Sequence, residues 1–160
     1  MSKRKYKILF VCTGNSCRSP MAEGILRDYL KRNKIENFEV ASAGIMAPSG
    51  LPASNYSLMV SVENGIDLSS HRSQLIDRDL IESSDLILVM EESHKKFIAK
   101  FFPFSKDRVY LLKNFGENAK GGEVADPMGY ELEIYRRCYK ELKKEIYRII
   151  LELIKISEEE

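Results

Sequence analysis

The chain has 160 residues, of which 25 are basic and 24 acidic, so its net charge is +1. A near-neutral chain offers no overall field to nucleic acid or to an anionic membrane surface, and neither is expected as a partner. No apolar run approaches the roughly 20 residues of a membrane span, and the one after the basic start is too short for a signal peptide. We expect a cytoplasmic monomer with one domain over residues 1–160 and a frayed acidic tail at 157–160.

Strand and helix patterns alternate from the start of the chain. A continuous apolar run at 7–12 is typical of a buried parallel strand. Apolar residues at helical spacing predict a helix over 20–33, and a second strand is predicted at 38–44. A loop with two prolines follows, and then a helix that ends at Gly65, a residue suited to cap a helix C-terminus.

The second half of the chain continues the alternation. The predicted elements are, in order, a short helix at 77–82, a strand at 85–90, a helix at 91–102 and a strand at 108–112. The Gly-rich stretch 114–129 has turn signals and no periodicity, which predicts a long loop. The last helix is expected to start near Tyr130, because an apolar stripe at helical spacing follows it.

Strands separated by helices imply right-handed crossovers and a parallel sheet that is covered on both faces. The pattern therefore predicts an α/β fold of the three-layer αβα sandwich type. Ligands of such sheets bind beyond the carboxyl ends of the strands. Cys12, at the end of the first strand, and Asp126, in the long loop, are both expected at that edge.

A loop suited to bind an anion follows the first strand. Cys12 and Arg18 stand at C-x5-R spacing, and the residues between them are Thr13, Gly14, Asn15, Ser16 and Cys17. Such a loop can curl so that its backbone amides face one oxyanion, and Gly14 is expected to supply the unusual backbone conformation. Ser19 is expected to be the N-cap of the next helix, with Pro20 in its first turn, so the loop ends on the positive pole of a helix.

The three cysteines are expected to be free thiols, because their number is odd and the chain is large enough to fold without disulfides. The C-x4-C spacing of Cys12 and Cys17 has no second Cys or His pair nearby, so no metal site is expected. A helix N-terminus and the Arg18 guanidinium would favour the thiolate form of Cys12, which makes it a nucleophile.

The stretches "VCTGNSCRSPMAEG" at 11–24 and "ADPMG" at 125–129 resemble the two motifs of the low-molecular-weight protein tyrosine phosphatases. The resemblance implies a four-stranded parallel sheet, no metal and no cofactor. It also implies phosphorylated proteins or peptides as substrates and inorganic phosphate as product. By position, Cys12 would be the nucleophile, Arg18 the clamp for the phosphoryl oxygens, and Asp126 the general acid and then the general base.

The resemblance extends to residues around the loop. Four polar residues match positions that form a hydrogen-bonded network behind the family's loop, namely Asn15, Ser19, Ser42 and His71. Ser19 would also stabilise the thiolate. Cys17 resembles the family's neighbouring cysteine, which can pair with an oxidised nucleophile, although a small buried residue explains it equally well. Cys138 lies on the apolar stripe of the last helix and is expected in the core.

Two substrate classes remain open. Ser16 and the Met128–Gly129 pair resemble the bacterial branch that acts on phosphoarginine, which carries a small hydroxyl residue and an apolar residue followed by Gly at these places. A small polar Ser16 suits a guanidinium better than a phenyl ring, and Asp126 could pair with that guanidinium. Tyr130 could instead supply the aromatic wall that suits phosphotyrosine.

Two other functions compete with a phosphatase. Arsenate reductases of the same fold need an extra cysteine pair to relay oxidation outward, and none lies between Cys17 and Cys138. A non-catalytic anion-binding module would have no use for both an activated thiol and a well-placed acid. The presence of Cys12 together with Asp126 therefore counts against such a module.

Overall fold

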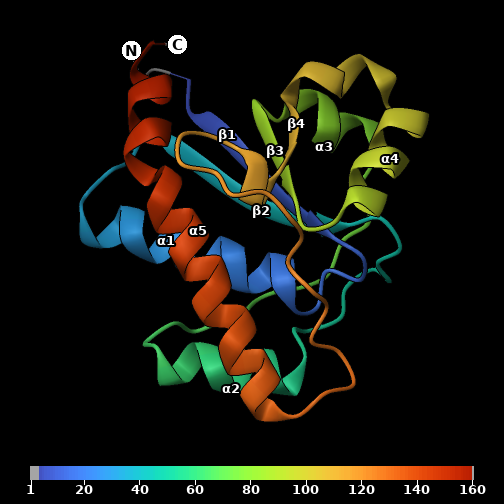
Figure 1. Ribbon diagram of the computed structural model, residues 1–160, viewed down its shortest axis with the longest axis vertical. Helices are drawn as coiled ribbons and strands as arrows, with labels where there is room; N and C mark the ends of the chain where they lie inside the picture. Colours follow the sequence, from blue (N-terminus) through green and yellow to red (C-terminus); the bar gives the residue numbers. More distant parts are fainter. Residues whose placement is uncertain (1–3, 160) are drawn as a thin grey trace.

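Four parallel strands form the centre of the computed structural model, which describes residues 4–159 (Figure 1). The strands are β1 (Tyr6–Cys12), β2 (Phe38–Gly44), β3 (Leu86–Val89) and β4 (Val109–Leu111), in the spatial order β2-β1-β3-β4. All three neighbouring pairs run parallel, which confirms the predicted four-stranded parallel sheet. Each predicted strand lies within one residue of an observed one at either end.

The helices also follow the predicted order. The α-helices are α1 (Arg18–Arg32), α2 (Asn55–Glu63), α3 (Arg78–Ser83), α4 (Glu92–Phe101) and α5 (Leu132–Glu159). Two 3-10 helices, η1 (Pro103–Arg108) and η2 (Leu112–Asn114), flank β4. Gly65 follows the C-cap of α2 with a φ of 78°, the left-handed conformation expected of a residue that ends a helix.

The C-terminal residues that the structure describes are helical. The helix α5 runs through Glu159, where the sequence predicts a frayed tail from 157, and residue 160 lies outside the described residues. Helical geometry in the last turn is compatible with transient opening, so fraying stays a prediction that amide hydrogen exchange can test.

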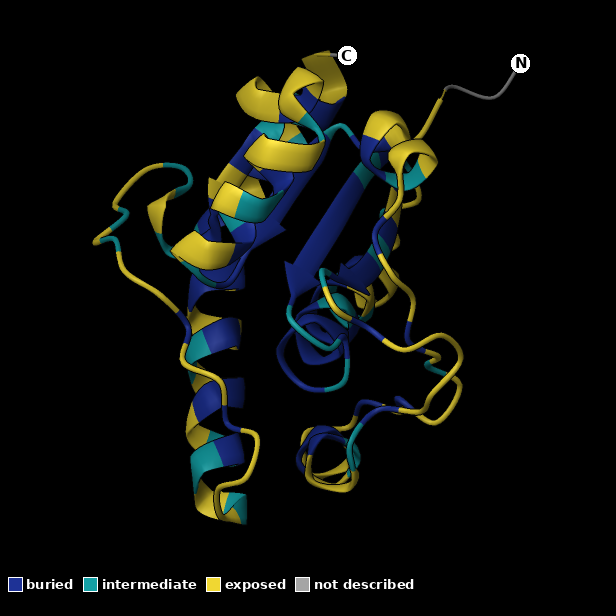
Figure 2. Cartoon of the chain, turned by 90° about the vertical axis from the view of Figure 1, so that its right-hand side faces the viewer, coloured by how far each residue is buried: buried dark blue, intermediate teal, exposed yellow. Residues whose placement is uncertain are grey.

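Helices cover both faces of the sheet. On one face, Ile8, Phe10 and Leu88 pack in a cluster with apolar residues of α1, α2 and α5. On the other face, Leu9 and Val11 pack with Ile98 and other apolar residues of α3 and α4. Alternate residues of β1 thus enter opposite cores, and Figure 2 shows the buried strands between outer layers whose exposed sides face solvent. The arrangement is a three-layer αβα sandwich.

The carboxyl ends of the strands meet at one edge. Cys12, the last residue of β1, is paired with Gly44, the last residue of β2. Val11 lies opposite Val89 of β3, which in turn lies opposite Leu111 of β4. The segments that follow these strands therefore gather at this edge, which is where the fold places a ligand site.

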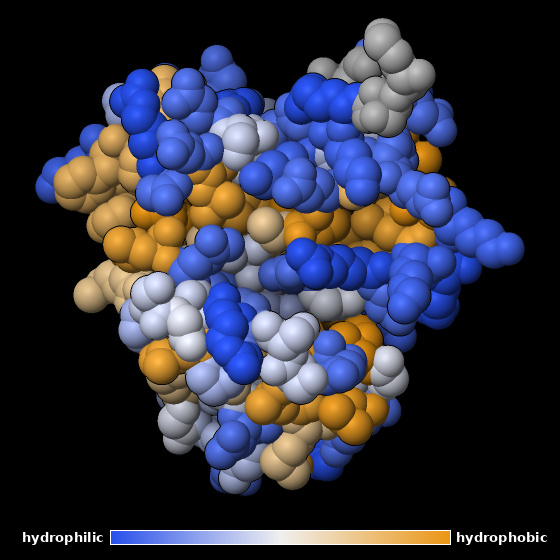
Figure 3. Space-filling view, turned by 180° about the vertical axis from the view of Figure 1, so that it is seen from behind, coloured by the Kyte–Doolittle hydropathy of each residue, from blue (hydrophilic) through white to orange (hydrophobic). Residues whose placement is uncertain are grey.

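The outer surface is mixed in character. On the face seen in Figure 3, hydrophilic side chains separate several smaller apolar areas. Among residues 4–159, no helix combines the length and the apolar character that crossing a bilayer requires.

Candidate active site

Cys12 lies at the end of β1 and begins a tight loop, residues 13–17, which we call the cysteine loop. The Cys12 side chain is buried, and so are Asn15 and Cys17 within the loop. No acceptor among residues 4–159 receives a hydrogen bond from the backbone amides of 13–17. Because backbone amides in a partly buried segment normally have partners, this row of free donors is suited to an anion.

The unusual backbone conformation of the loop belongs to Asn15, not to Gly14 as predicted. Asn15 has a φ of 54°, in the left-handed region, whereas Gly14 has no positive φ. Asn tolerates this region better than most residues do, and its side chain is held here by buried partners. A β-carbon on Gly14 would meet only Ser16 Oγ, at 3.7 Å.

Gly44 allows the cysteine loop to lie directly against the end of β2. A β-carbon at this position would overlap the carbonyl oxygen of Thr13 and would lie 3.0 Å from the amide nitrogen of Asn15. The amides of Ile45 and Met46 bond the carbonyls of Cys12 and Thr13, at 3.0 and 2.9 Å. The sequence pattern identifies Gly44 only as a strand end, and this contact is not visible in it.

Ser19 lies behind the sulfur of Cys12. Its Oγ is 2.9 Å from Cys12 Sγ and 2.8 Å from Asn15 Nδ2. The prediction that Ser19 caps α1 is wrong, because the helix begins at Arg18 and its N-cap is Cys17, which makes no side-chain cap bond. The hydroxyl contacts the sulfur and the Asn15 amide instead, and Pro20 lies in the first turn, where its missing N–H costs nothing.

The network extends behind the loop through Asn15. Its Nδ2 donates to Ser42 Oγ at 3.0 Å, and its Oδ1 accepts from the amide of Gln74 at 3.0 Å. His71 Nε2 lies 2.8 Å from the Asn15 carbonyl oxygen, and because a carbonyl only accepts, that nitrogen carries the proton. The four predicted residues of this network therefore lie together. Gln74 joins them from a segment that sequence reasoning did not select.

Arg18 is buried, at 1% exposure, and its guanidinium is held by groups from three segments. Nη1 donates to Glu91 Oε2 at 2.7 Å and to the carbonyl of Val124 at 2.8 Å. Nη2 makes only longer contacts, to Thr13 Oγ1 at 3.5 Å and to Asp126 Oδ2 at 3.6 Å. The short bonds fix Nη1, so the edge formed by Nε and Nη2 is the one suited to grip two oxygens of an anion.

Glu91 and His94 belong to this site and were missed from the sequence. The amide of Glu91 donates to His94 Nδ1 at 3.1 Å, so that nitrogen carries no proton and Nε2 does. His94 Nε2 then donates to Thr13 Oγ1 at 2.9 Å. Burial, and then the positive charge of Arg18, lowers the pKa of His94 to about 4. The signal that could have found Glu91 is its position just after the apolar strand, at the edge where the ligand site was expected.

Asp126 stands at the open side of the site. Its side chain is 45% exposed, and Oδ1 accepts the amide of Met128 at 3.0 Å in a tight turn. Oδ2 faces Arg18. Met128 and Tyr130 are both exposed, and Ser16 is half-buried. The carboxylate can therefore reach solvent and the arginine at once.

All three cysteines are free thiols. Cys17 Sγ lies 3.3 Å from Ser54 Oγ and 3.6 Å from the hydroxyl of Tyr135. Burial, and then the hydrogen bond with Cys17, raises the pKa of Tyr135 to about 12, so this hydroxyl keeps its proton and can donate to the sulfur. Cys138 lies in the core, as predicted, and burial raises its pKa to about 12.

The fold and the loop together define a class of α/β protein that binds an oxyanion beside a thiol at the carboxyl edge of a parallel sheet. Comparison with known proteins identifies the family. The model of the low molecular weight phosphotyrosine protein phosphatases matches residues 7–159. The chain therefore belongs to this family and is a phosphatase.

Relatives and solved structures agree with this assignment. The chain is 40% identical over 144 residues to a protein-arginine-phosphatase of Geobacillus stearothermophilus, which covers 90% of this chain and 93% of the relative. It is 36% identical over 143 residues to the low molecular weight protein-tyrosine-phosphatase PtpB of Staphylococcus aureus, which covers 89% and 96%. The structure of a YwlE arginine phosphatase mutant with a phosphorylated active-site serine aligns with a TM-score of 0.88 at 36% identity, covering 93% and 96%.

Proposed function

We propose that this chain removes phosphate from phosphorylated arginine residues of proteins, with Cys12 as nucleophile, Arg18 as phosphate clamp and Asp126 as general acid and base. The observation that carries the proposal is the cysteine loop, whose amides have no acceptor among residues 4–159 and which ends on the buried Arg18. Peptide N–H groups and a guanidinium are the donors that a phosphoryl dianion needs. The chemistry calls for no cofactor.

In the first step the Cys12 thiolate attacks phosphorus, and the bond from phosphorus to the guanidine nitrogen breaks. Asp126, as a carboxylic acid, gives its proton to that nitrogen, so that the arginine side chain leaves as an intact guanidinium group. The phosphoryl group is then bonded to sulfur. The loop amides and the Nε and Nη2 edge of Arg18 stabilise the charge on its oxygens in the transition state.

In the second step a water molecule attacks the phosphorus of the cysteinyl phosphate. Asp126, now a carboxylate, accepts the proton from that water, and the bond between phosphorus and sulfur breaks to restore the thiolate. Inorganic phosphate leaves the loop. The partial exposure of Asp126 supports this role, because the attacking water must reach the carboxylate from solvent.

Ser16 and Met128 support arginine as the phosphorylated residue. Ser16 is small and polar, so a guanidinium can enter beside it without losing hydrogen-bond partners. The exposed carboxyl group of Asp126 offers the guanidinium N–H groups a hydrogen-bond acceptor. The similarity to the protein-arginine-phosphatase of Geobacillus stearothermophilus points to the same substrate class.

Phosphotyrosine is the second candidate substrate, and Tyr130 favours it. Its ring is exposed on the turn that follows Asp126, where it could stack on an aryl leaving group. The similarity to PtpB of Staphylococcus aureus, named a protein-tyrosine-phosphatase, supports the same activity.

The experiment that decides between the two substrates replaces Ser16. We expect Ser16→Ile to lower kcat/KM on a phosphoarginine peptide by about tenfold and on the matching phosphotyrosine peptide by less than about threefold. Ser16→Ala is the matched control, because it removes the hydroxyl and keeps the open mouth. Equal losses on both peptides for Ser16→Ile would remove the argument from this residue.

We also propose the cytoplasm as the site of action and a monomer as the active form. The three free thiols support a reducing compartment. Size-exclusion chromatography with light scattering at micromolar concentration tests the oligomeric state, and a stable dimer would contradict the proposal.

A further inference from the structure

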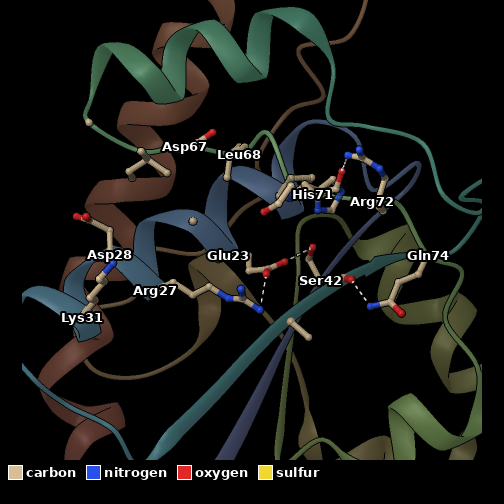
Figure 4. Close-up of a pocket in the computed structure, with 16 residues that line it drawn as sticks. Glu23, Arg27, Asp28, Lys31, Ser42, Asp67, Leu68, His71, Arg72 and Gln74 are labelled. Atoms are coloured by element: carbon tan, nitrogen blue, oxygen red, sulfur yellow. Dashed lines mark hydrogen bonds and ion pairs between the residues drawn. The ribbon is translucent and has the colours of Figure 1, made fainter.

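A cavity of about 530 Å³ lies behind the cysteine loop, bordered by α1, β2 and the segment 65–74 (Figure 4). Glu23 and Ser42 are part of its wall. In Figure 4 the Glu23 carboxylate points toward the Ser42 hydroxyl on one side and the Arg27 guanidinium on the other. The other titratable or charged groups that line the cavity are Asp28, Lys31, Asp67, His71 and Arg72.

Glu23 fixes the direction of its hydrogen bond with Ser42. The two oxygens are 2.6 Å apart, and an ionised carboxylate can only accept, so the Ser42 hydroxyl must donate. Arg27 Nη2 lies 2.8 Å from the other carboxylate oxygen and forms an ion pair with it. With its proton directed at Glu23, Ser42 Oγ presents only lone pairs to Asn15.

The lone pair of Ser42 Oγ and the backbone amide of Gln74 together fix the orientation of the Asn15 side-chain amide. Ser42 Oγ needs a donor and the Gln74 amide needs an acceptor, so Nδ2 faces Ser42 and Oδ1 faces Gln74. The second proton of Nδ2 then points to Ser19 Oγ, at 2.8 Å. Ser19 thus accepts from Asn15 and keeps its own proton for another partner.

Two acceptors compete for the Ser19 proton. Cys12 Sγ is 2.9 Å from Ser19 Oγ, and the carbonyl of Ala43 is 3.4 Å away. When the sulfur is ionised, the shorter and charge-assisted bond favours donation to Cys12. If the Asn15 amide were reversed, Ser19 would donate to its oxygen, and the sulfur would lose this donor.

We propose that Glu23 is a positioning residue that, together with the Gln74 backbone amide, sets the direction of the hydrogen-bond chain Ser42, Asn15, Ser19, so that its last proton points at the Cys12 sulfur. Ser42 then donates to Glu23, and Asn15 donates to both Ser42 and Ser19, which leaves the Ser19 proton for the thiolate. Of these side chains, only the carboxylate cannot reverse its role. The effect of Glu23 on turnover rests on the proposed role of Cys12 as nucleophile. Its effect on the ionisation of the Cys12 thiol is independent of that role.

Glu23→Gln tests the proposal. The loss of the negative charge and the loss of the fixed hydrogen-bond direction predict opposite changes in the pH at which the Cys12 thiol ionises. Removing a negative charge near a thiol favours the thiolate by Coulomb's law and would lower the pH at which the thiol ionises. Gln can both donate and accept, so it frees Ser42 to reverse and leaves Asn15 held by the Gln74 backbone amide without the carboxylate. Reversal of the chain would raise that pH. We expect the pH midpoint of iodoacetamide alkylation at Cys12 to rise by about one unit, a factor of about ten in the thiolate fraction below the midpoint.

Fragment-ion mass spectrometry measures the alkylation of Cys12 and distinguishes it from alkylation of Cys17. The matched control is Asp28→Asn, which removes the same charge from the same helix and cavity without touching the chain. A rise for Glu23→Gln and none for Asp28→Asn supports the proposal. An unchanged or lower midpoint for Glu23→Gln overturns it, whether or not the protein hydrolyses phosphoarginine.

Ser42→Ala supplies a second test that does not depend on how Glu23→Gln folds. It breaks the chain in the middle, so we expect its midpoint to rise as well. In the Ser42→Ala background, Glu23→Gln should add less than about 0.2 unit, because the carboxylate no longer reaches Asn15. A further rise as large as that in the wild type would show that Glu23 acts by another route and would overturn the proposal.

Discussion

The cysteine loop is surrounded by titratable groups on one side and by neutral hydrogen-bonding groups on the other. We call these groups the front, which is Arg18, Glu91, His94 and Asp126, and the back, which is Asn15, Ser19 and Ser42. At the front the contacts to Arg18 range from 2.7 to 3.6 Å, and one carboxylate is half exposed. At the back all three residues are at most 2% exposed, and the two bonds that join them measure 2.8 and 3.0 Å. The front can change partners during a reaction, whereas the back holds one arrangement.

The largest effect is expected where front and back meet, at the sulfur itself. Cys12→Ser replaces a thiol that ionises by a hydroxyl that does not, so turnover should fall by at least about 10⁴-fold, or about 5.5 kcal/mol. Phosphate should still bind, since the amides and Arg18 are unchanged. Turnover of a phosphoarginine peptide and phosphate titration followed by NMR measure the two properties.

The matched control for that prediction is Cys17→Ser, which makes the same atomic change five positions along the chain. Cys17 contacts Ser54 and Tyr135, away from Cys12. We expect its turnover to stay within about threefold of the wild type. Normal turnover by Cys12→Ser, or an equal loss in both variants, would mean that the nucleophile lies elsewhere.

The second largest effect is expected at the clamp in the front. Lysine cannot present two parallel donors, so Arg18→Lys should lower kcat/KM by about 10²- to 10³-fold, or about 3–4 kcal/mol. Arg27→Lys is the matched control, because Arg27 contacts Glu23 at the back and its side chain is 61% exposed. It should change kcat/KM by less than about threefold. A similar small loss for Arg18→Lys would show that the fork geometry is not used.

The sequence predicts the parts of the site that depend on local pattern. The strand 38–44 and the C-x5-R spacing are local, and both are where the pattern places them. The contact between Arg18 and Glu91 joins residues 73 positions apart, and only the pairing of β1 with β3 brings them together. No local pattern contains such a pair.

Predictions from local residue preferences were wrong at two positions of the site. Ser is a residue type that commonly caps helices, yet the Ser19 hydroxyl contacts the Cys12 sulfur. Gly14 is the residue that most easily adopts a left-handed backbone, yet Asn15 adopts it, because its amide is fixed by Ser42 and Gln74. In both cases buried contacts in the tertiary structure outweigh the intrinsic preference, which the chain alone does not reveal.

His94 gives the front a dependence on pH that the back should lack. Its pKa is about 4 in the folded protein and 6.5 for the unperturbed side chain, so the unfolded chain binds a proton first as the pH falls. Stability from this residue is therefore full above about pH 6.5 and is lost toward pH 4, by on the order of 3 kcal/mol in all.

Urea unfolding of the wild type and of His94→Gln at several pH values measures this contribution. The wild-type advantage in free energy of unfolding should shrink as the pH falls from 7 to 5, because Gln does not titrate. A constant difference over this range would mean that His94 is not held neutral by its surroundings.

The smallest effect is expected at Gly44, where the loop meets β2. A β-carbon there would overlap the carbonyl of Thr13 and lie 2.9 Å from Ala47 Cβ, and backbone atoms must move to admit it. Gly44→Ala should cost about 2 kcal/mol of stability, or roughly 5 °C in Tm by calorimetry. Gly14→Ala adds the same methyl group where the nearest atom is 3.7 Å away, so its Tm should change by less than about 2 °C. Equal losses in the two variants would mean that the loop is not held by close backbone contact with β2, and the rigid back would then rest on the side chains of Asn15, Ser19 and Ser42 alone.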